Sequence, residues 1–308
     1  MTIAKKLCVL AVTTAGILGL VRCAGDPSDE DREPAGRSLE RLVTDYTSGF
    51  HEDSGYRLPT RDERRTMAAG VALLLDRERA AAERRLADVD FTVRTVTDPA
   101  GGRRFAEVAD RSEDGPAPRG WGRVYIDLDS PVRWSAQIPH PVADRCTERL
   151  GAELLSRSPG GVLVVAGAHR KAGRGDGADV AHRRDSVFHA ICAELARRGL
   201  PGVQLHGMDD DSAPEHDVVA STGRGRQAVA EGRDLADALR EQGYDVCRAW
   251  ARSCPLAGRS NVQGRTAAAH DVPFLHIEFG HRIREDRARS TEAVEALADV
   301  TRTWRRDE

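Results

Sequence analysis

The stretch GVLVVAGA, residues 161–168, consists of small and apolar residues without a single charge. A strand with one solvent-exposed face alternates apolar and polar residues. A short unbroken apolar run is instead typical of a strand in a parallel sheet that is buried on both faces. Further strand patterns follow at 202–207, 244–250 and 272–280, with helical patterns between them and at 290–306. This alternation predicts an α/β fold whose mostly parallel sheet carries helices on both faces.

The segment before this stretch has a different pattern. Thr60 and Glu63 form a capping box, which predicts a helix from there to about Leu86. Residues 91–110 then alternate around a turn that contains one proline and two glycines, which predicts a β-hairpin. We therefore expect an N-terminal helix and a β-hairpin ahead of the α/β alternation.

The first residues have the layout of a secretory signal. Two lysines precede an apolar run from Leu7 to Val21, and small residues and an acidic stretch follow. The run is short for a membrane span, and export can end in cleavage after Ala24 or in lipidation at Cys23. The protein is expected to be secreted or at the cell envelope, with membrane contact only through this segment. The expected organisation is a signal segment (1–24), an acidic tether (25–37) and one α/β domain (38–308), with 38–120 as its N-terminal helix and hairpin.

The composition excludes some partners. Charged residues make up 31% of the chain and aromatic residues 5%, whereas a nucleic-acid platform has a basic surface with stacking rings. Removing residues 1–24 takes away three basic residues and no acid, so the formal net charge changes from −3 to −6. Neither a nucleic acid nor another polyanion is expected as a partner.

The cysteines limit the chemistry further. The chain has no CxxC motif, so a thiolate zinc site is not expected. In an exported chain, Cys247 and Cys254 are predicted to form a disulfide. The alternative is that the cysteines remaining after residue 24 are buried free thiols.

Polar side chains close the predicted strands. His140, His169, Arg170 and His206 stand where strand patterns end, and Glu278 lies inside the last one, alternating with apolar residues. Because ligands of open α/β sheets bind at the carboxyl ends of the strands, we expect these side chains to meet at one rim. A glutamate in so apolar a strand is costly to bury without a partner, which would be a metal ion, an arginine or a water molecule to be activated.

A metal site follows from this arrangement. His140 and His206, with one carboxylate, predict three ligands and a fourth position for water, as catalytic zinc requires. If Pro141 opens a helix, Asp144 and Glu148 fall on the His140 side, and Asp144 is the nearer. Glu148 would lie about 12 Å away in helical rise, so it would ligate only if the helix began later. In the competing interpretation the aspartate caps the helix, the glutamate pairs with an arginine, and the histidines are hydrogen-bonded loop residues.

Four further side chains have weaker signals. Asn261 and Gln263 lie in the segment GRSNVQGR and either line the same cleft or belong to an ordinary turn. His182 either orients a metal ligand through its second ring nitrogen or is an exposed loop residue. His169 is expected in the same supporting position.

The order of these motifs resembles a known group of enzymes. The motifs are PHP at 139–141, DRCTE at 144–148, AHRKAG at 168–173, DVAH at 179–182, LHGM at 205–208 and LHIEFGHRIRED at 275–286. Over roughly residues 134–286 this order is similar to that of the N-formylglutamate amidohydrolases and their zinc carboxypeptidase-like relatives. The chain departs from the amidohydrolases at Gly207 and Met208, where they usually have a serine after the histidine, and in its closing segment FGHRIRED.

The resemblance implies a mechanism and a role for each residue. Zinc would polarise an amide carbonyl and lower the pKa of its water to about 7, while a carboxylate moves the proton to the leaving amine. Arginine side chains suit a substrate carboxylate, because their planar forks bind it in a bidentate manner. The implied roles are zinc ligand for His140, for Asp144 or Glu148, and for His206; catalytic base for Glu278; and carboxylate clamp for Arg170 and Arg282.

We therefore expect a secreted zinc-dependent hydrolase that cleaves an amide next to a carboxylate, in an N-acyl amino acid or a peptide. An alternative is an envelope-tethered protein that keeps this fold and binds a ligand without catalysing a reaction. A lesser alternative is dinucleotide binding, because Gly223, Gly225 and Ala228 match G-x-G-x-x-A and Asp245 lies twenty residues after Gly225.

Overall fold

The computed structural model describes residues 37–111 and 119–304. The predicted signal segment, and the predicted tether except for Arg37, lie outside the described residues. Within the two described ranges, no helix is both long enough and apolar enough to cross a membrane.

The described ranges contain the following helices and strands. The helices are α1 (Leu39–Thr47), α2 (Arg61–Leu75), α3 (Arg79–Ala87), α4 (Thr147–Arg157), α5 (Val187–Arg197), α6 (Val229–Glu241), α7 (Val262–Ala269), α8 (His281–Glu285) and α9 (Arg287–Thr303). The strands are β1 (Phe91–Thr97), β2 (Arg104–Asp110), β3 (Arg123–Asp127), β4 (Trp134–Ile138), β5 (Gly161–Val165), β6 (Gly202–Met208), β7 (Val218–Ser221), β8 (Val246–Arg248) and β9 (Phe274–Gly280). The predicted hairpin is β1 and β2, and the stretch at 161–168 contains β5.

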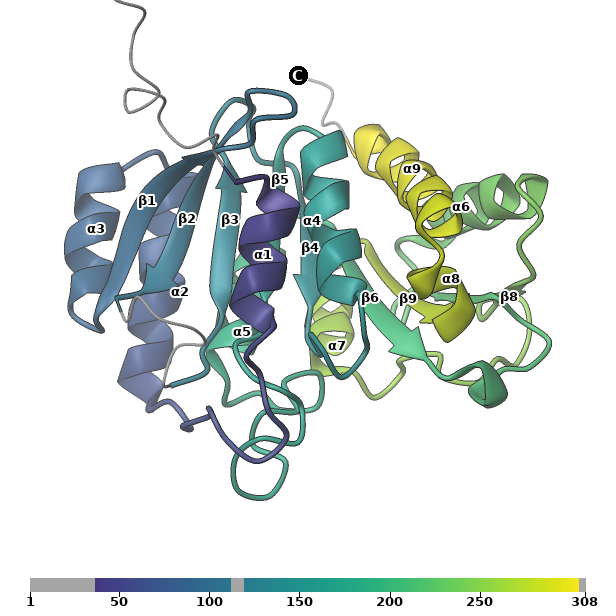
Figure 1. The fold of residues 1–308 in the computed structure, drawn as a ribbon, viewed down its shortest axis with the longest axis horizontal. Coiled ribbons are helices and arrows are strands. Elements are labelled where there is room, and N and C mark those ends of the chain that lie inside the picture. The colour runs from purple at the N-terminus through teal and green to yellow at the C-terminus, as the bar shows by residue number, and fades with distance from the viewer. Residues whose placement is uncertain (1–36, 112–118, 305–308) are drawn as a thin grey trace, which may run out of the picture. The chain divides into compact units, whose positions relative to one another are not determined.

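The strands form one sheet in the order β1-β2-β3-β5-β4-β6-β9-β7-β8 (Figure 1). Four of the strand pairs in the described ranges are parallel, namely β4 with β5, β4 with β6, β6 with β9 and β7 with β8. The other four are antiparallel, because the hairpin joins the sheet through β3 and β7 runs against β9. The sheet is therefore mixed, and the expectation of a mostly parallel sheet is corrected.

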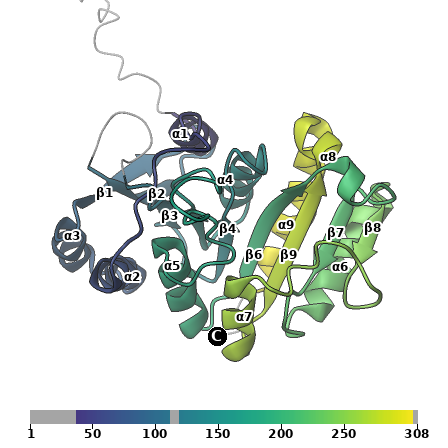
Figure 2. The same ribbon diagram turned by 90° about the horizontal axis from the view of Figure 1, so that it is seen from below.

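Helices cover both faces of the sheet, as predicted (Figure 2). Leu163 and Val165 of β5 belong to the core beneath α1, α4, α6 and α9. Val162 and Val164 belong to the core beneath α2, α3 and α5. Because both faces of β5 are buried, its side chains are apolar at every position, which is the pattern seen in the sequence.

Two helix boundaries differ from the sequence prediction. The capping box of Thr60 and Glu63 is present, but the helix ends at Leu75 and a separate helix, α3, starts at Arg79. The chain folds back so closely that a Cβ atom on Gly70 would lie 2.5 Å from the side chain of Leu86. A single continuous helix would carry Leu86 away from this contact.

The cysteine alternatives are resolved for the described residues. Cys247 and Cys254 form a disulfide, as one of the two predictions stated. Cys192 is buried and Cys146 is partly buried, and both are free thiols.

The parallel pairing of β5, β4, β6 and β9 brings their carboxyl ends to one rim of the sheet. His206 on β6 and Glu278 on β9 are direct register partners. The polar side chains at the predicted strand ends were expected to meet at one rim of the sheet, and the parallel strands provide that rim.

Candidate metal site and cleft

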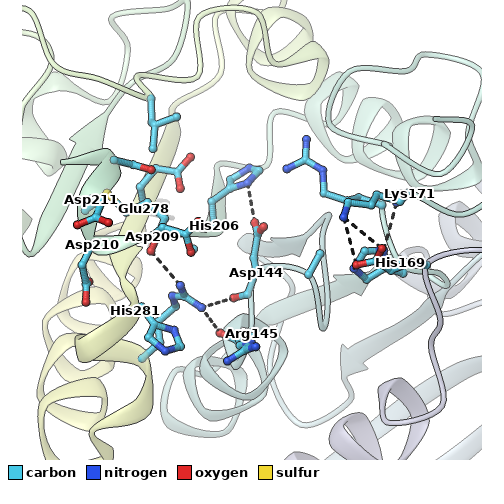
Figure 3. A pocket seen from close by; sticks show the side chains of 18 residues that line it. Asp144, Arg145, His169, Lys171, His206, Asp209, Asp210, Asp211, Glu278 and His281 are labelled. Carbon is cyan, nitrogen blue, oxygen red and sulfur yellow. Dashed lines mark hydrogen bonds and ion pairs between the residues drawn. The ribbon is translucent and has the colours of Figure 1, made fainter. Parts of the chain in front are cut away.

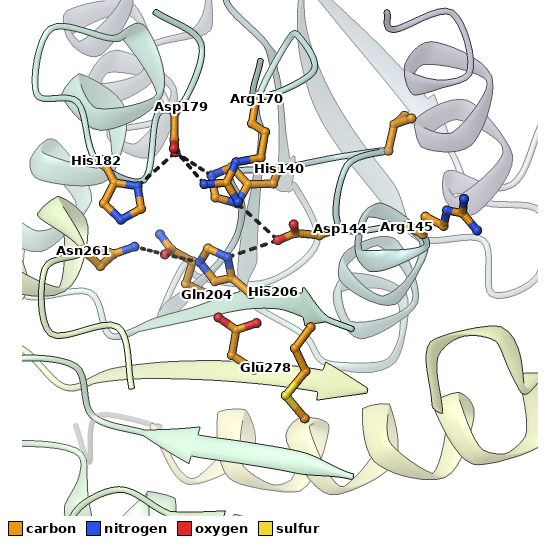
Figure 4. Close-up of polar contacts among 12 residues, drawn as sticks. His140, Asp144, Arg145, Arg170, Asp179, His182, Gln204, His206, Asn261 and Glu278 are labelled. Carbon is orange, nitrogen blue, oxygen red and sulfur yellow. Dashed lines mark hydrogen bonds and ion pairs between the residues drawn. The ribbon is translucent and has the colours of Figure 1, made fainter. Parts of the chain in front are cut away.

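Three buried side chains meet at this rim (Figure 4). The Nδ1 atoms of His140 and His206 each lie 3.2 Å from the same carboxylate oxygen, Oδ2 of Asp144. The three side chains offer ligand atoms that all lie within 4.8 Å of one another. The two histidines and Asp144 are therefore placed as a three-ligand metal site requires.

The backbone after β4 brings Asp144, and not Glu148, to this point. Helix α4 begins at Thr147 rather than at Pro141, and in the preceding turn the Asp144 N–H donates to the carbonyl of His140 over 2.9 Å. Glu148 lies in the first turn of α4 and accepts a backbone N–H of the turn over 3.4 Å. Pro141 therefore does not open the helix, and Glu148 does not share the contacts of the two histidines.

The second ring nitrogen of each histidine has its own acceptor. Nε2 of His140 lies 2.8 Å from an oxygen of Asp179, and Nε2 of His206 lies 2.8 Å from the amide oxygen of Gln204. Asp179 also binds Nδ1 of His182 over 3.1 Å. In metal sites such outer partners fix the ring orientation and tautomer of a ligating histidine.

Backbone groups fix the orientation of the Gln204 amide. Gln263 donates its amide nitrogen to a backbone carbonyl over 2.9 Å, so its oxygen faces the amide nitrogen of Gln204. Asn261 accepts a backbone N–H over 2.9 Å, so its nitrogen donates to the oxygen of Gln204. The oxygen of Gln204 is therefore turned toward His206, and Nε2 of His206 must be the donor.

This tautomer leaves the Nδ1 lone pair of His206 facing a carboxylate oxygen of Asp144. Two acceptors at this distance repel each other unless a proton or a metal cation accompanies them. Burial lowers the pKa of His206, which disfavours the proton. A divalent cation with two imidazole ligands and one carboxylate fits this donor set.

Glu278 lies beside the three candidate ligands. The residue is 7% exposed and its side chain has no hydrogen bond to any described residue, and Nε2 of His276 lies 3.8 Å from its carboxylate. Burial raises the pKa of Glu278 to about 8. The ring of His276 stacks on His206 with the centroids 4.5 Å apart, and its Nδ1 is buried without a hydrogen-bond partner among the described residues. An unpaired buried carboxylate next to a candidate metal site is suited to taking up a proton.

The site opens into a cavity of about 1000 Å³ (Figure 3). His169 and Lys171, after β5, lie on one side of Asp144 and His206, and the three acids at 209–211, after β6, lie on the other side. Glu278, Arg145, Arg170, Leu256, His281 and Arg284 also line the cavity. Its two ends therefore differ in charge.

The predicted substrate-binding residues are in different places. Arg170 lines the cavity and pairs with Asp179 over 2.8 Å. Arg282 does not line it, because its guanidinium pairs with Asp217 over 2.9 Å. Asn261 and Gln263 are buried behind the histidines in the amide network described above, so neither lines the cleft.

The two predicted supporting histidines also differ. His182 reaches the site through Asp179, as a residue that orients a ligand's partner rather than the ligand itself. His169 lines the cavity, where its Nδ1 accepts the backbone N–H of Lys171 over 3.3 Å. It has no hydrogen bond to a candidate ligand in the described residues.

Arg284 was not predicted and holds the rim together. Its buried guanidinium donates to the carbonyls of Phe279 over 3.0 Å, Asp144 over 2.7 Å and Met208 over 3.0 Å. A Cβ atom on Gly207 would lie 2.4 Å from this guanidinium. The glycine at the position where the amidohydrolases usually carry a serine therefore has a steric reason.

The glycine-rich segment 223–228 lies away from the rim. It follows the carboxyl end of β7, which is antiparallel to β9, so it is at the opposite end of the sheet. Two of its N–H groups already donate, from Gly223 to Ser221 Oγ and from Arg226 to Gln227 Oε1, both over 2.9 Å. The segment therefore contributes nothing to the cavity.

Comparisons with known proteins found similar solved structures. No family model and no curated protein sequence matches the chain. An N-formylglutamate amidohydrolase from Ralstonia eutropha JMP134 is similar over 60% of this chain and 97% of its own, with 14% identity and a TM-score of 0.40. A putative carboxypeptidase A from Shewanella denitrificans OS-217 (15% identity, 73% and 68% coverage, TM-score 0.41) and a metallo-carboxypeptidase from Burkholderia cenocepacia (13%, 74% and 68%, 0.40) are also similar.

Proposed function

We propose that the protein is a zinc-dependent hydrolase that cleaves an amide bond next to a carboxylate, in an N-acyl amino acid or a peptide. His140, Asp144 and His206 would hold the metal. The observation that carries the proposal is the Nδ1 acceptor of His206 turned toward a carboxylate oxygen of Asp144, because this contact is favourable only when a proton or a metal cation accompanies it, and burial of His206 disfavours the proton. Three protein ligands leave a fourth position for water, as in catalytic zinc sites.

Zinc, when bound, would supply a Lewis acid for the amide carbonyl and lower the pKa of a water molecule. Glu278 would accept the proton of that water on its carboxylate and return it to the nitrogen of the leaving amine. Its raised pKa supports this role, since a base that must also act as an acid works best when its pKa is near neutral. Asp179 and Gln204 would keep the two imidazoles in orientation.

Basic side chains that line the cavity support a substrate carboxylate. Arg145 is largely exposed, and its nearest acidic partner, Glu285, is 3.9 Å away. Among the described residues, Lys171 is paired only with the exposed Glu52, at 3.2 Å. Such surface pairs are weak and can exchange for a substrate anion. Arg282, in contrast, does not line the cavity, so the carboxylate contact is proposed for Arg145, Arg170 and Lys171 instead.

The place of action is proposed to be outside the cytoplasm. The amino-terminal pattern predicts export, and whether cleavage or lipidation follows it stays a prediction. The Cys247–Cys254 disulfide supports an oxidising compartment, where such bonds persist.

Metal binding and hydrolysis are tested separately. Elemental analysis of the purified protein is expected to give about one zinc per chain, and zinc at a hundred times its Kd should raise the free energy of unfolding by about 2.7 kcal/mol. His206→Ala should lose both effects, whereas His270→Ala, which removes an exposed histidine outside the cavity, should keep them.

Glu278→Gln separates the enzyme from a binding protein. This variant should keep the zinc and lose amide hydrolysis, because an amide side chain cannot take up the proton. Hydrolysis that is equally fast in the variant would contradict the assigned base. A wild-type protein that holds zinc and binds carboxylates without cleaving any amide would support the non-catalytic alternative.

A further inference from the structure

Leu256 is an apolar side chain in a charged cavity. It lines the cavity of the candidate site and is 45% exposed. Among the described residues, Leu58 at 48% is the other large hydrophobic side chain with such exposure, and it does not line this cavity. Packing in the hydrophobic core therefore does not explain why a leucine is present at position 256.

The backbone at Leu256 is in an unfavourable conformation. Its φ angle is 52°, in the left-handed region, where glycine and asparagine are tolerated and branched side chains are rare. Residues held in such conformations gather at functional sites, because the surrounding structure must enforce them. A leucine that is both strained and exposed points to a role in contact with a ligand.

Neighbouring contacts enforce this conformation. Cys254, two residues before Leu256, is tied to β8 by the disulfide with Cys247. The carbonyl of Ala257 accepts the hydroxyl of Ser221 over 2.7 Å. Gly258 lies directly against the ring of His276, since a Cβ atom there would be 2.4 Å from that ring. The segment is thus fixed on both sides of Leu256, which makes it a rigid part of the cavity wall.

The contacts of its neighbours place Leu256 on the β9 side of the cavity. Gly258 lies against His276 of β9 and Ala257 accepts from Ser221 of β7, whereas Lys171 and Arg170 follow β5, on the other side of β4 and β6. Glu278 on β9 and the three candidate ligands lie between these two ends. An amide held at the candidate site would therefore extend toward cations on one side and toward Leu256 on the other.

We infer that Leu256 is a specificity-determining residue that receives an aliphatic group of the substrate on the side of the amide away from the carboxylate. This inference rests on the proposed function and names its substrate class, an amino acid whose nitrogen carries an acyl chain of several carbons. Hydrolysis adds the water oxygen to the acyl carbon and a proton to the nitrogen, and the C–N bond breaks. The products are a fatty acid and the free amino acid.

Three substrates with one leaving group test the inference on the zinc-loaded protein. They are N-hexanoylglycine, N-acetylglycine and N-(6-aminohexanoyl)glycine, and kcat/KM is measured for each. The wild type is expected to prefer hexanoyl to acetyl by about tenfold, the effect of burying roughly two methylene groups. Leu256→Ala should reduce this preference to about twofold, and Leu58→Ala should leave it unchanged.

Leu256→Gly separates recognition from folding. Glycine adopts the left-handed conformation freely, so this variant should have an unchanged or raised Tm while it loses the preference. A preference that survives in both Leu256 variants would overturn the inference. A wild type that prefers the 6-aminohexanoyl substrate would overturn it as well, since the acids at 209–211 would then govern this end of the cavity.

A binding measurement distinguishes failure of the inference from failure of the proposed function. Calorimetric titration of zinc-loaded Glu278→Gln with N-hexanoylglycine should show tighter binding than with N-acetylglycine, and adding Leu256→Ala should weaken the hexanoyl binding about fivefold. If the wild type hydrolyses no amide and this loss is still seen, the catalytic proposal fails and the recognition by Leu256 stands. Equal binding with and without Leu256, or no binding of N-hexanoylglycine, overturns the inference.

Discussion

Replacing Gln204 with leucine removes the acceptor that sets the tautomer of His206. The Gln204 side chain is fully buried and has hydrogen bonds with His206, Asn261, Gln137 and Gln263. Leucine would leave four buried polar groups without this partner, and each such group costs about 1 kcal/mol or more. The free energy of unfolding should therefore fall by about 4 kcal/mol, and zinc affinity should fall by about 10- to 100-fold because His206 loses its outer hydrogen bond.

Gln137→Leu is the matched control. It removes another buried amide of the same network, which touches Gln204 but neither histidine. Gln204 still has Gln263 as an acceptor, so its orientation should hold and zinc affinity should stay within about twofold of the wild type, while stability falls by about 1–2 kcal/mol.

Two measurements on the Gln204 and Gln137 variants separate stability from metal binding. Urea unfolding of the zinc-free proteins gives the stability difference, and competition with a chelating dye gives the zinc Kd. If Gln204→Leu binds zinc as tightly as Gln137→Leu does, the tautomer of His206 is not set through this network, and the acceptor contact with Asp144 loses its basis.

Other predictions concern the fold and its response to pH. Burial lowers the pKa of His189 to about 4 from an ordinary value of 6.5, so the unfolded state takes up the proton first, and about 3 kcal/mol of stability should be lost as the pH falls from 7 to 4. Urea unfolding of His189→Gln should lack that part of the slope, and an unchanged slope would count against it. Thr60→Ala removes the capping box and should lower the free energy of unfolding by about 1 kcal/mol; an unaltered urea midpoint would argue against this cap. Gly258 has a φ of 61°, and Gly258→Ala places a Cβ atom 2.4 Å from the ring of His276. This variant should lower the free energy of unfolding by about 2–3 kcal/mol. A thermal midpoint equal to that of the wild type would rule out this packing.

The sequence predicted the strands better than their directions. The apolar run at 161–168 shows that β5 is buried on both faces, because burial determines which side chains a strand can carry. Nothing in such a run depends on whether its neighbour is parallel or antiparallel. The antiparallel contacts of β3 with β5 and of β7 with β9 are set by the connections between them, so the mixed sheet was not predictable from periodicity.

The sequence predicted those candidate ligands whose position depends only on the topology of the sheet. His140 and His206 end parallel strands, and such ends meet at one rim. The choice between Asp144 and Glu148 depended on where α4 begins, which is set by a turn with left-handed residues at Val142 and Cys146. Neither is a glycine or an asparagine, so the sequence carries no signal for this turn.

The remaining differences between the predicted and the observed site residues arise in a loop and in the orientation of one helix. Asp179 opens the DVAH motif at 179–182, but this segment has no periodic pattern, so the contact of Asp179 with His140 was not predicted. Arg282 and Arg284 are two residues apart on a helix and therefore point in nearly opposite directions. Only the position at which α8 follows β9 determines that Arg284 turns to the rim and Arg282 to Asp217.

One signal for the amide network was present in the strands themselves. Gln137, Gln204 and His276 lie side by side on neighbouring strands β4, β6 and β9, and Ser221 on β7 continues the same row. A row of polar side chains across the middle of a buried sheet is costly unless its members satisfy one another, so its presence indicates a function that requires it. Gln204 stands two residues before His206, on the same face of the same strand, which is the position from which a side chain can hold the outer nitrogen of that histidine. The polar row thus places the support of the candidate metal site inside the sheet, where the backbone of rigid strands fixes it, and this explains why a mobile loop is not needed to orient His206.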